Sequence, residues 1–139
     1  WRAKMRINKR IFQYIEQELY DYEDTKKELE QCREEIIYGE HRPEVSVQSG
    51  LGDVTQSKAV KLASSTYILQ AERTTKAIEK GLSELGQQHK DLYRLKYRNC
   101  LPWQEVMLEL GISDRTYFRW RRELVTIVGR NMGVIGEYY

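Results

Sequence analysis

Apolar residues recur at helical intervals along two long stretches of the chain. The first stretch, from about Lys9 to Tyr38, contains no proline or glycine, and its apolar residues keep a near-heptad spacing: Ile11, Ile15, Tyr22, Leu29 and Ile36. This pattern predicts one long helix, or two helices with a break near residues 20–22. Because the apolar stripe is thin, we expect this helix to need a partner, either from the same chain or from a second copy.

The second stretch predicts a long middle helix after a linker. Residues 39–57 contain Pro43, Gly50 and Gly52 among polar side chains and lack helical periodicity, so they predict a flexible linker. Asp53 or Thr55 is then a suitable cap for a helix that runs to about Leu85. Its apolar stripe is regular and wide enough to be core: Val60, Ala63, Tyr67, Ala71, Thr74, Ile78, Leu82 and Leu85.

After residues 86–88 the pattern predicts a compact unit of three short helices. The first covers His89 to Tyr97, and a turn follows at residues 99–101. Pro102 suits the first position of the second helix, where no amide hydrogen is needed. The buried face of this helix is supplied by Val106, Met107 and Leu110.

The last predicted helix follows a tight turn. Gly111 permits the bend, Ile112 anchors it in the core, and Ser113 is a good N-cap for a helix from Asp114 to about Val128. Glycines at positions 129, 133 and 136 mark the fraying end of this helix.

These elements predict an all-α protein in which two long helices, joined by a flexible linker, precede a C-terminal trihelical helix-turn-helix unit. The expected division comprises a basic arm, an acidic helix and the linker (residues 1–57), the middle helix (58–88), the helix-turn-helix domain (89–130) and a tail (131–139).

The last helix carries the candidate chemistry. Arg115, Arg119 and Arg122 fall on one side of it, whereas Tyr117, Trp120, Leu124 and Ile127 fall on the other, about 100° of rotation separating successive residues. A duplex can therefore meet the basic side without disturbing the core, which is the layout of a helix-turn-helix that reads DNA. A merely solvated basic face is the alternative. The turn at Gly111 and the exposed aromatic Phe118 among the arginines favour the DNA-reading interpretation.

The individual roles follow from the side-chain chemistry. Arg115 and Arg119 are the candidate base readers, because arginine can contact guanine O6 and N7 together. Thr116 or Phe118 can contact a thymine methyl group. The remaining candidates are assigned to phosphate contacts: Arg121, Arg122, Gln104, Lys96 and Arg98.

The charge distribution supports this placement. The net charge is only +2, but residues 90–130 carry nine bases against five acids, and residues 11–40 carry ten acids against three bases. Phosphate repels the acidic segment and attracts the basic one. The basic arm over residues 2–10 is a weaker signal, since a solvated helix start explains it equally well.

Other function classes find little support. Cys32 and Cys100 are isolated, and His41 and His89 do not complete a zinc-finger spacing, so we expect reduced thiols and no metal or other cofactor. The sequence has no phosphate loop, no Ser-His-Asp arrangement and no acidic cluster beside the basic helix, which disfavours an enzyme. No apolar run approaches the roughly 20 residues of a membrane span. We therefore expect a soluble cytoplasmic protein.

Two families share short motifs with this chain. Residues 92–97, 102–106 and 111–124 resemble the region-four DNA-binding domain of bacterial sigma factors. Residues 15–22, 25–29, 52–55 and 116–122 resemble the RinA/ArpU family of phage transcriptional regulators, and this resemblance covers most of the chain.

The resemblance implies an activator of phage late genes, for packaging, morphogenesis and lysis, that binds double-stranded promoter DNA and acts with host RNA polymerase. It also implies the DNA-reading role for residues at the start of the last helix: Arg115, Thr116, Phe118, Arg119 and Arg122. The rival interpretations are a small terminase-like packaging subunit that forms rings, and a coiled-coil module that binds only protein. A homodimer reading two half-sites is compatible with the thin stripe of the first helix.

Overall fold

The computed structural model describes residues 7–41 and 51–135, and the side chains of residues 7–34 and 65–135. All regular structure within these residues is helical, so the all-α prediction is confirmed there. The elements are α1 (Lys9–His41), α2 (Leu51–Glu84), α3 (Gln87–Tyr93), the π-helical turn η2 (Arg94–Arg98), α4 (Trp103–Leu110) and α5 (Asp114–Met132).

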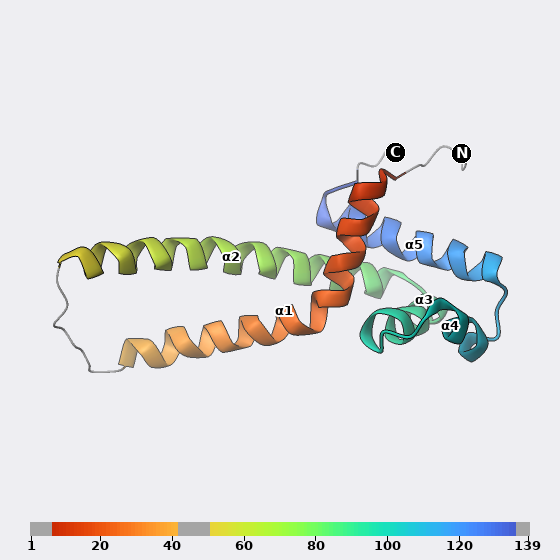
Figure 1. Ribbon diagram of the computed structural model, residues 1–139, viewed down its shortest axis with the longest axis horizontal. Helices are drawn as coiled ribbons and strands as arrows, with labels where there is room; N and C mark the ends of the chain where they lie inside the picture. Colours follow the sequence, from red (N-terminus) through yellow and green to blue (C-terminus); the bar gives the residue numbers. More distant parts are fainter. Residues whose placement is uncertain (1–6, 42–50, 136–139) are drawn as a thin grey trace.

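Helices α1 and α2 form a long antiparallel hairpin that projects from the rest of the molecule (Figure 1). Helix α1 is one continuous helix and not two helices with a break near residues 20–22, although it bends where it leaves the core. The heptad residues Ile15, Tyr22 and Leu29 are buried. The partner that the thin stripe needs is therefore α2 of the same chain.

The polar contacts of the hairpin lie on its exposed sides. Lys26 Nζ lies 3.6 Å from Glu79, and Arg33 Nη2 lies 3.1 Å from Glu72. Farther along the hairpin, Tyr67 remains 48% exposed while its hydroxyl donates a hydrogen bond to Glu28. Exposed ion pairs of this kind contribute little free energy, so the buried apolar stripe holds the two helices together.

The predicted linker is longer than the segment between the two helices. Helix α1 continues to His41 and α2 already begins at Leu51, so Asp53 and Thr55 lie inside α2 and the prediction that one of them caps it is wrong. Gly52 costs about 1 kcal/mol relative to alanine inside a helix, and the hydrogen bonds of the added turn offset this cost. Residues 42–50 lie outside the described residues.

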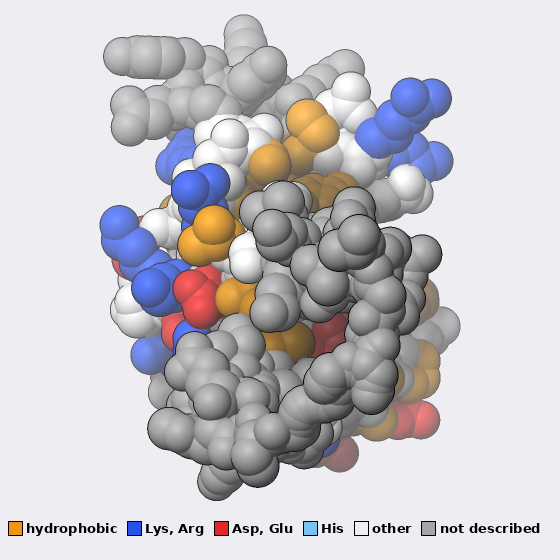
Figure 2. Space-filling model, turned by 90° about the vertical axis from the view of Figure 1, so that its left-hand side faces the viewer, with side chains coloured by type: hydrophobic (Ala, Val, Ile, Leu, Met, Phe, Trp, Pro, Cys, Tyr) orange, Lys and Arg blue, Asp and Glu red, His pale blue; other side chains and the backbone are white. Residues whose placement is uncertain are grey.

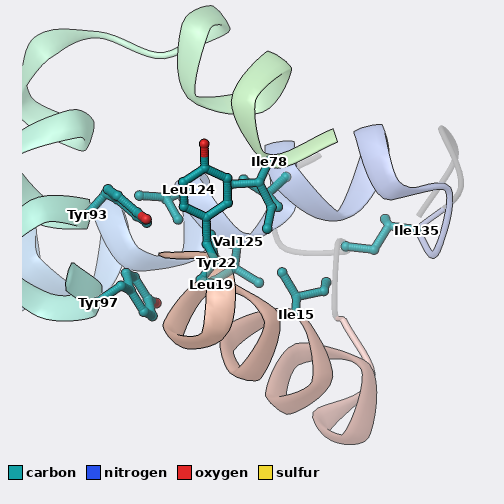
Figure 3. Close-up of a cluster of buried hydrophobic side chains, with 10 residues drawn as sticks. Ile15, Leu19, Tyr22, Ile78, Tyr93, Tyr97, Leu124, Val125 and Ile135 are labelled. Carbon is teal, nitrogen blue, oxygen red and sulfur yellow. The ribbon is translucent and has the colours of Figure 1, made fainter. Parts of the chain in front are cut away.

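Two groups of buried side chains hold the C-terminal half of the chain. The first lies where α1, α2, η2 and α5 meet (Figure 3), and it comprises Ile15, Leu19, Tyr22, Ile78, Tyr93, Tyr97, Leu124, Val125, Val128 and Ile135. The second lies between α3, η2, α4 and the first half of α5, and it comprises Leu92, Leu95, Val106 and Tyr117. Helix α5 therefore contributes to both buried groups. The first group also joins residues on both sides of position 88, the predicted boundary between the middle helix and the helix-turn-helix domain.

The turns around α4 follow local chemistry. Gly111 caps α4 at φ 65°, a left-handed conformation that favours glycine. Ser113 is the N-cap of α5, as predicted, and its hydroxyl oxygen accepts a hydrogen bond from the Thr116 amide at 3.2 Å. Pro102 is the N-cap of α4 and not its first residue, a shift of one position.

The end of α5 differs from the prediction. The helix continues to Met132 and ends at Gly133, which has φ 78°. Gly129 lies within the helix and is buried, so it does not mark a fraying end. A Cβ atom at this position would lie 2.6 Å from Ile15 Cδ1 and closer still to Ile135 Cδ1. Glycine therefore lets α5 approach α1 and the chain that follows α5.

The described surface of the hairpin carries charged side chains and a few apolar ones, such as Leu69, which is 56% exposed. Among the residues that the structure describes, no helix is both long enough and apolar enough to span a bilayer. Viewed from the end of the hairpin, lysine and arginine side chains occupy both flanks of the molecule, with hydrophobic side chains between them (Figure 2). Cys32 and Cys100 are free thiols.

Replacing Gly129 with alanine is expected to lower the free energy of unfolding by about 1–2 kcal/mol, because overpacking outweighs the roughly 1 kcal/mol that alanine gains inside a helix. Urea denaturation followed by circular dichroism measures the change. Ile135→Val, which removes the methyl group nearest to the added one, should cost about 1 kcal/mol alone and less in the Gly129→Ala background. Equal costs in the two backgrounds would contradict the steric explanation.

Candidate nucleic-acid interface

The first half of α5 is held in place from one side only. Tyr117 is buried against α3 and α4, and Trp120 packs at the edge of the same group, as the sequence predicted for both. The indole of Trp120 lies 6.0 Å from the His89 ring. The His89 Nε2 atom in turn lies 2.9 Å from a carboxylate oxygen of Glu123. These contacts leave the opposite side of the helix open to solvent.

The open side carries the predicted arginines. Arg115, Arg119 and Arg122 are all exposed, and Phe118 is 41% exposed. At about 100° of rotation per residue, these four positions occupy an arc of about 100° on α5. We call this set the arginine arc. Thr116, the fifth residue predicted here, is half-buried, and its hydroxyl accepts a hydrogen bond from Ser113 at 3.1 Å. Thr116 therefore supports the Ser113 cap, and its contact with a thymine methyl group stays a prediction.

An aromatic patch adjoins the arginine arc. The rings of Trp103 and Phe118 lie 5.7 Å apart, and both lie near the buried Tyr117, at 6.3 and 5.1 Å. Trp103 is 40% exposed at the first turn of α4. The sequence alone does not mark Trp103 as a site residue. Trp103 shares the helical stripe of Val106, so periodicity alone indicates burial, and the position at the helix end is what exposes it.

Gln104 and Arg98 are exposed, as a phosphate contact requires. Gln104 follows Trp103 on the first turn of α4, which has no side-chain cap. The amide groups of this turn have no partner within the helix and can donate to an anion. Arg98 lies at the end of η2.

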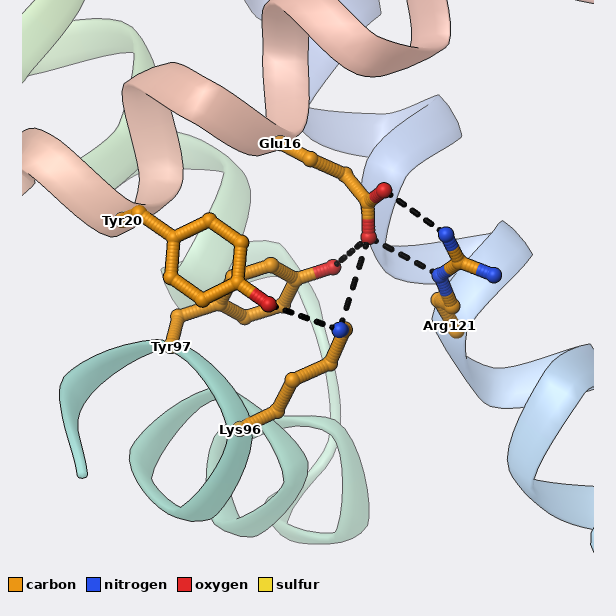
Figure 4. Close-up of polar contacts among 5 residues, drawn as sticks. All are labelled: Glu16, Tyr20, Lys96, Tyr97 and Arg121. Carbon is orange, nitrogen blue, oxygen red and sulfur yellow. Dashed lines mark hydrogen bonds and ion pairs between the residues drawn. The ribbon is translucent and has the colours of Figure 1, made fainter. Parts of the chain in front are cut away.

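Lys96 and Arg121 are set apart from the other predicted cations. Both engage the carboxylate of Glu16 on α1 (Figure 4). Arg121 donates two hydrogen bonds to it, from Nε at 2.8 Å and from Nη2 at 2.7 Å. Lys96 Nζ lies 3.8 Å from Glu16 and donates to the Tyr20 hydroxyl at 2.9 Å. Both cations are therefore paired inside the molecule, which the sequence did not indicate, and phosphate contacts by them stay a prediction.

Glu16 is the centre of this network. It is 9% exposed and also accepts a hydrogen bond of 2.6 Å from the buried Tyr97 hydroxyl. Burial raises the pKa of Glu16, but the hydrogen bonds from Arg121 and Tyr97 and the charges of Arg121 and Lys96 outweigh it, so the net pKa lies below 4.5. The pKa of Tyr97 lies well above its ordinary value, first because of burial and then because of Glu16. Both groups therefore keep one charge state at neutral pH.

The sequence contains a signal for this network. Phe12, Glu16 and Leu19 fall on one face of α1 at intervals of four and three, so Glu16 lies on the apolar stripe and not on the solvated face. Arg121 is rotated by about 120° from Arg115 on α5, which takes it off the arginine arc. Its guanidinium lies 4.9 Å from the Phe12 ring centroid.

Comparison with known proteins gives two matches. The model of a family described as "Protein of unknown function (DUF722)" matches residues 7–130. "Transcriptional activator rinA" of Staphylococcus phage phi11 is 24% identical over 127 residues, which span 86% of this chain and 88% of the relative. The resemblance to RinA-like regulators is thereby confirmed. No solved structure matches the chain significantly.

Glu16→Gln is expected to lower the free energy of unfolding at pH 7 by about 3 kcal/mol, because it leaves the Arg121 guanidinium without its counter-charge. The folded-state pKa of Glu16 lies below 4.5. Its ionised form therefore stabilises the fold above that pH, and this contribution is lost as the pH falls through the folded-state pKa. Urea denaturation should thus show the gap between the two proteins narrowing at acidic pH.

Glu72→Gln is the matched control for this experiment. Glu72 pairs with Arg33 at 3.1 Å on the hairpin, where the arginine side chain is 58% exposed. Its loss should cost about 0.5 kcal/mol. A gap between wild type and Glu16→Gln that stays constant from pH 7 into the acid range would refute the assignment of a paired, ionised Glu16.

Proposed function

The chain belongs to the DUF722 family, and from that membership and the name of its phage relative we propose that it is a transcriptional activator encoded by a phage. In this proposal it reads promoter DNA with α5, activates late genes for packaging, morphogenesis and lysis, and acts with host RNA polymerase. The α4–α5 pair is then a helix-turn-helix whose second helix enters the major groove.

The arginine arc is the observation that carries this proposal. Within the described part of the chain, Arg115, Arg119 and Arg122 have no ion-pair partner, whereas Arg121 on the same helix is fully paired with Glu16. Three unpaired guanidinium groups on one narrow arc give a surface that attracts phosphate and can contact base edges. Among the described residues, the three arginines of this side of α5 are exposed.

The roles of the side chains follow from their positions. Arg115 and Arg119, on the first turns of α5, are the base readers, and Arg122 one turn later contacts phosphate. Phe118 contacts a thymine methyl group, with Trp103 beside it at 5.7 Å as a further apolar contact. Gln104 and the free amides at the start of α4 hold the flanking phosphate.

The Glu16 network positions this surface. Arg121 is on the same helix as the arginine arc, and its paired guanidinium ties the middle of α5 to α1. Lys96 and Tyr97 tie η2 to the same carboxylate. The buried carboxylate therefore helps the apolar group between α5, α1 and α2 to fix the angle between α5 and the hairpin. In this proposal the hairpin contacts polymerase.

Arg115→Ala and Arg119→Ala should each weaken binding to a specific promoter about tenfold or more, because each removes a bidentate contact to guanine. Fluorescence anisotropy with the phage's packaging-gene promoter, across a salt series, measures the effect. Lys27→Ala is the matched control, since Lys27 is an exposed cation of α1 outside the arc. Equal, steeply salt-dependent binding of wild type to promoter and scrambled DNA would overturn the sequence-reading role.

Phe118→Ala should weaken promoter binding about fivefold through the lost methyl contact. It should lower the free energy of unfolding by only about 1 kcal/mol, because the side chain is 41% exposed and loses its ring contacts with Trp103 and Tyr117. Leu108→Ala is its control: Leu108 is 81% exposed on α4 and lies outside the arginine arc. Equal losses of promoter affinity in Phe118→Ala and Leu108→Ala, measured in the same assay, would show that Phe118 makes no specific contact with DNA.

A further inference from the structure

A second surface lies at the other end of α5. A groove of about 530 Å³ is bounded by α2, the first turns of α1 and the residues that end α5. Its residues on α5 begin at Asn131, nine positions after Arg122. At 1.5 Å per residue this places the groove about 13 Å along the helix axis from the arginine arc.

Three cations of α2 line this groove. Arg73, Lys76 and Lys80 follow one another at intervals of three and four, which places them on one face of the helix. All three are exposed, and none of them has an ion-pair partner among the described residues.

Two acids of α2 pair with α1. Glu72 pairs with Arg33, and Glu79 pairs with Lys26 and accepts a hydrogen bond from Tyr22. Glu84, four residues after Lys80, is exposed but does not line the groove. The cations Arg73, Lys76 and Lys80 are therefore the charged residues of α2 that line it.

The floor of the groove is apolar. Ala77 is buried, and Met132 and Val134 are half-buried. Tyr14 forms the edge on α1, and burial, with a smaller effect of Glu18, raises the pKa of Tyr14 above 10.0. The hydroxyl therefore stays protonated and can donate a hydrogen bond to an anion at neutral pH.

We propose that this groove is a docking site for an acidic peptide segment of a partner protein, with one apolar side chain of that segment on the Ala77–Met132–Val134 floor. Carboxylates of the segment pair with Arg73, Lys76 and Lys80. A DNA duplex fits the site less well, because its backbone presents phosphates and no apolar group that could occupy a concave floor. The groove and the arginine arc are separate, so the protein can hold DNA and this partner together.

Fluorescence anisotropy on the full chain tests the proposal with a labelled peptide of glutamates flanking one phenylalanine. The wild type should bind it, and Arg73→Glu/Lys80→Glu should weaken binding by at least about tenfold. Lys27→Glu/Lys90→Glu changes the net charge equally at exposed positions outside the groove and should leave binding within about twofold. Peptides with glutamine for glutamate, or serine for phenylalanine, should lose binding.

Promoter binding is measured on the same variants. The groove variant Arg73→Glu/Lys80→Glu should bind promoter DNA as tightly as the control Lys27→Glu/Lys90→Glu does. Arg115→Ala should bind DNA more weakly and bind the peptide unchanged. A failure of the DNA-binding proposal and a failure of the peptide-binding proposal can thus be distinguished. If the Arg73→Glu/Lys80→Glu variant does not fold, the milder variant Lys76→Gln/Lys80→Gln is used in its place. No binding of the peptide to wild type, equal losses in groove and control variants, or displacement of the peptide by duplex DNA would each overturn the proposal.

Discussion

The carboxylate of Glu16 is the contact on which the arrangement of the helices depends. It accepts hydrogen bonds from Arg121 of α5 and Tyr97 of η2 and lies beside Lys96, so three elements meet at one side chain of α1. A buried carboxylate is costly unless its charge is balanced and its oxygens are hydrogen-bonded. A displacement of α5 or η2 from α1 would break these contacts, and this penalty favours the observed packing.

The second constraint is that α5 serves two buried groups at once. Its first half carries Tyr117 in the group with α3 and α4, and its second half carries Leu124, Val125 and Val128 in the group with α1 and α2. Arg121 lies between the two halves and pairs with Glu16. The sequence requirements of the reading surface and of the core thus alternate along one helix, with the arginine arc on the only side that neither group occupies.

Much of this arrangement could be predicted from periodicity and capping. The long α1, the Gly111 turn, the Ser113 cap and the burial of Tyr117 all follow from local rules, and the structure confirms them. Contacts between distant positions could not be predicted in this way. Glu16 and Arg121 are 105 residues apart, and no local pattern shows that they meet. The direct DNA contacts of the arginine arc remain predictions.

The unpredicted contacts share one physical cause. Lys96 and Arg121 looked like free cations and Gly129 looked like a helix end, because in each case the deciding neighbour belongs to a different part of the chain. Composition indicates which residues prefer solvent, but tertiary packing decides which of them are paired instead.

The length of α2 converts a small tilt at one end of the helix into a large displacement at the other end. It has 34 residues, of which the last few turns pack on α5, and at 1.5 Å per residue it extends about 50 Å. A tilt of about 5° where α5 meets the hairpin would displace the far end of α2 by about 4 Å over that length. If α5 reads DNA as proposed, a small adjustment of this helix on different DNA sequences becomes a displacement of several ångströms at the far end of the hairpin.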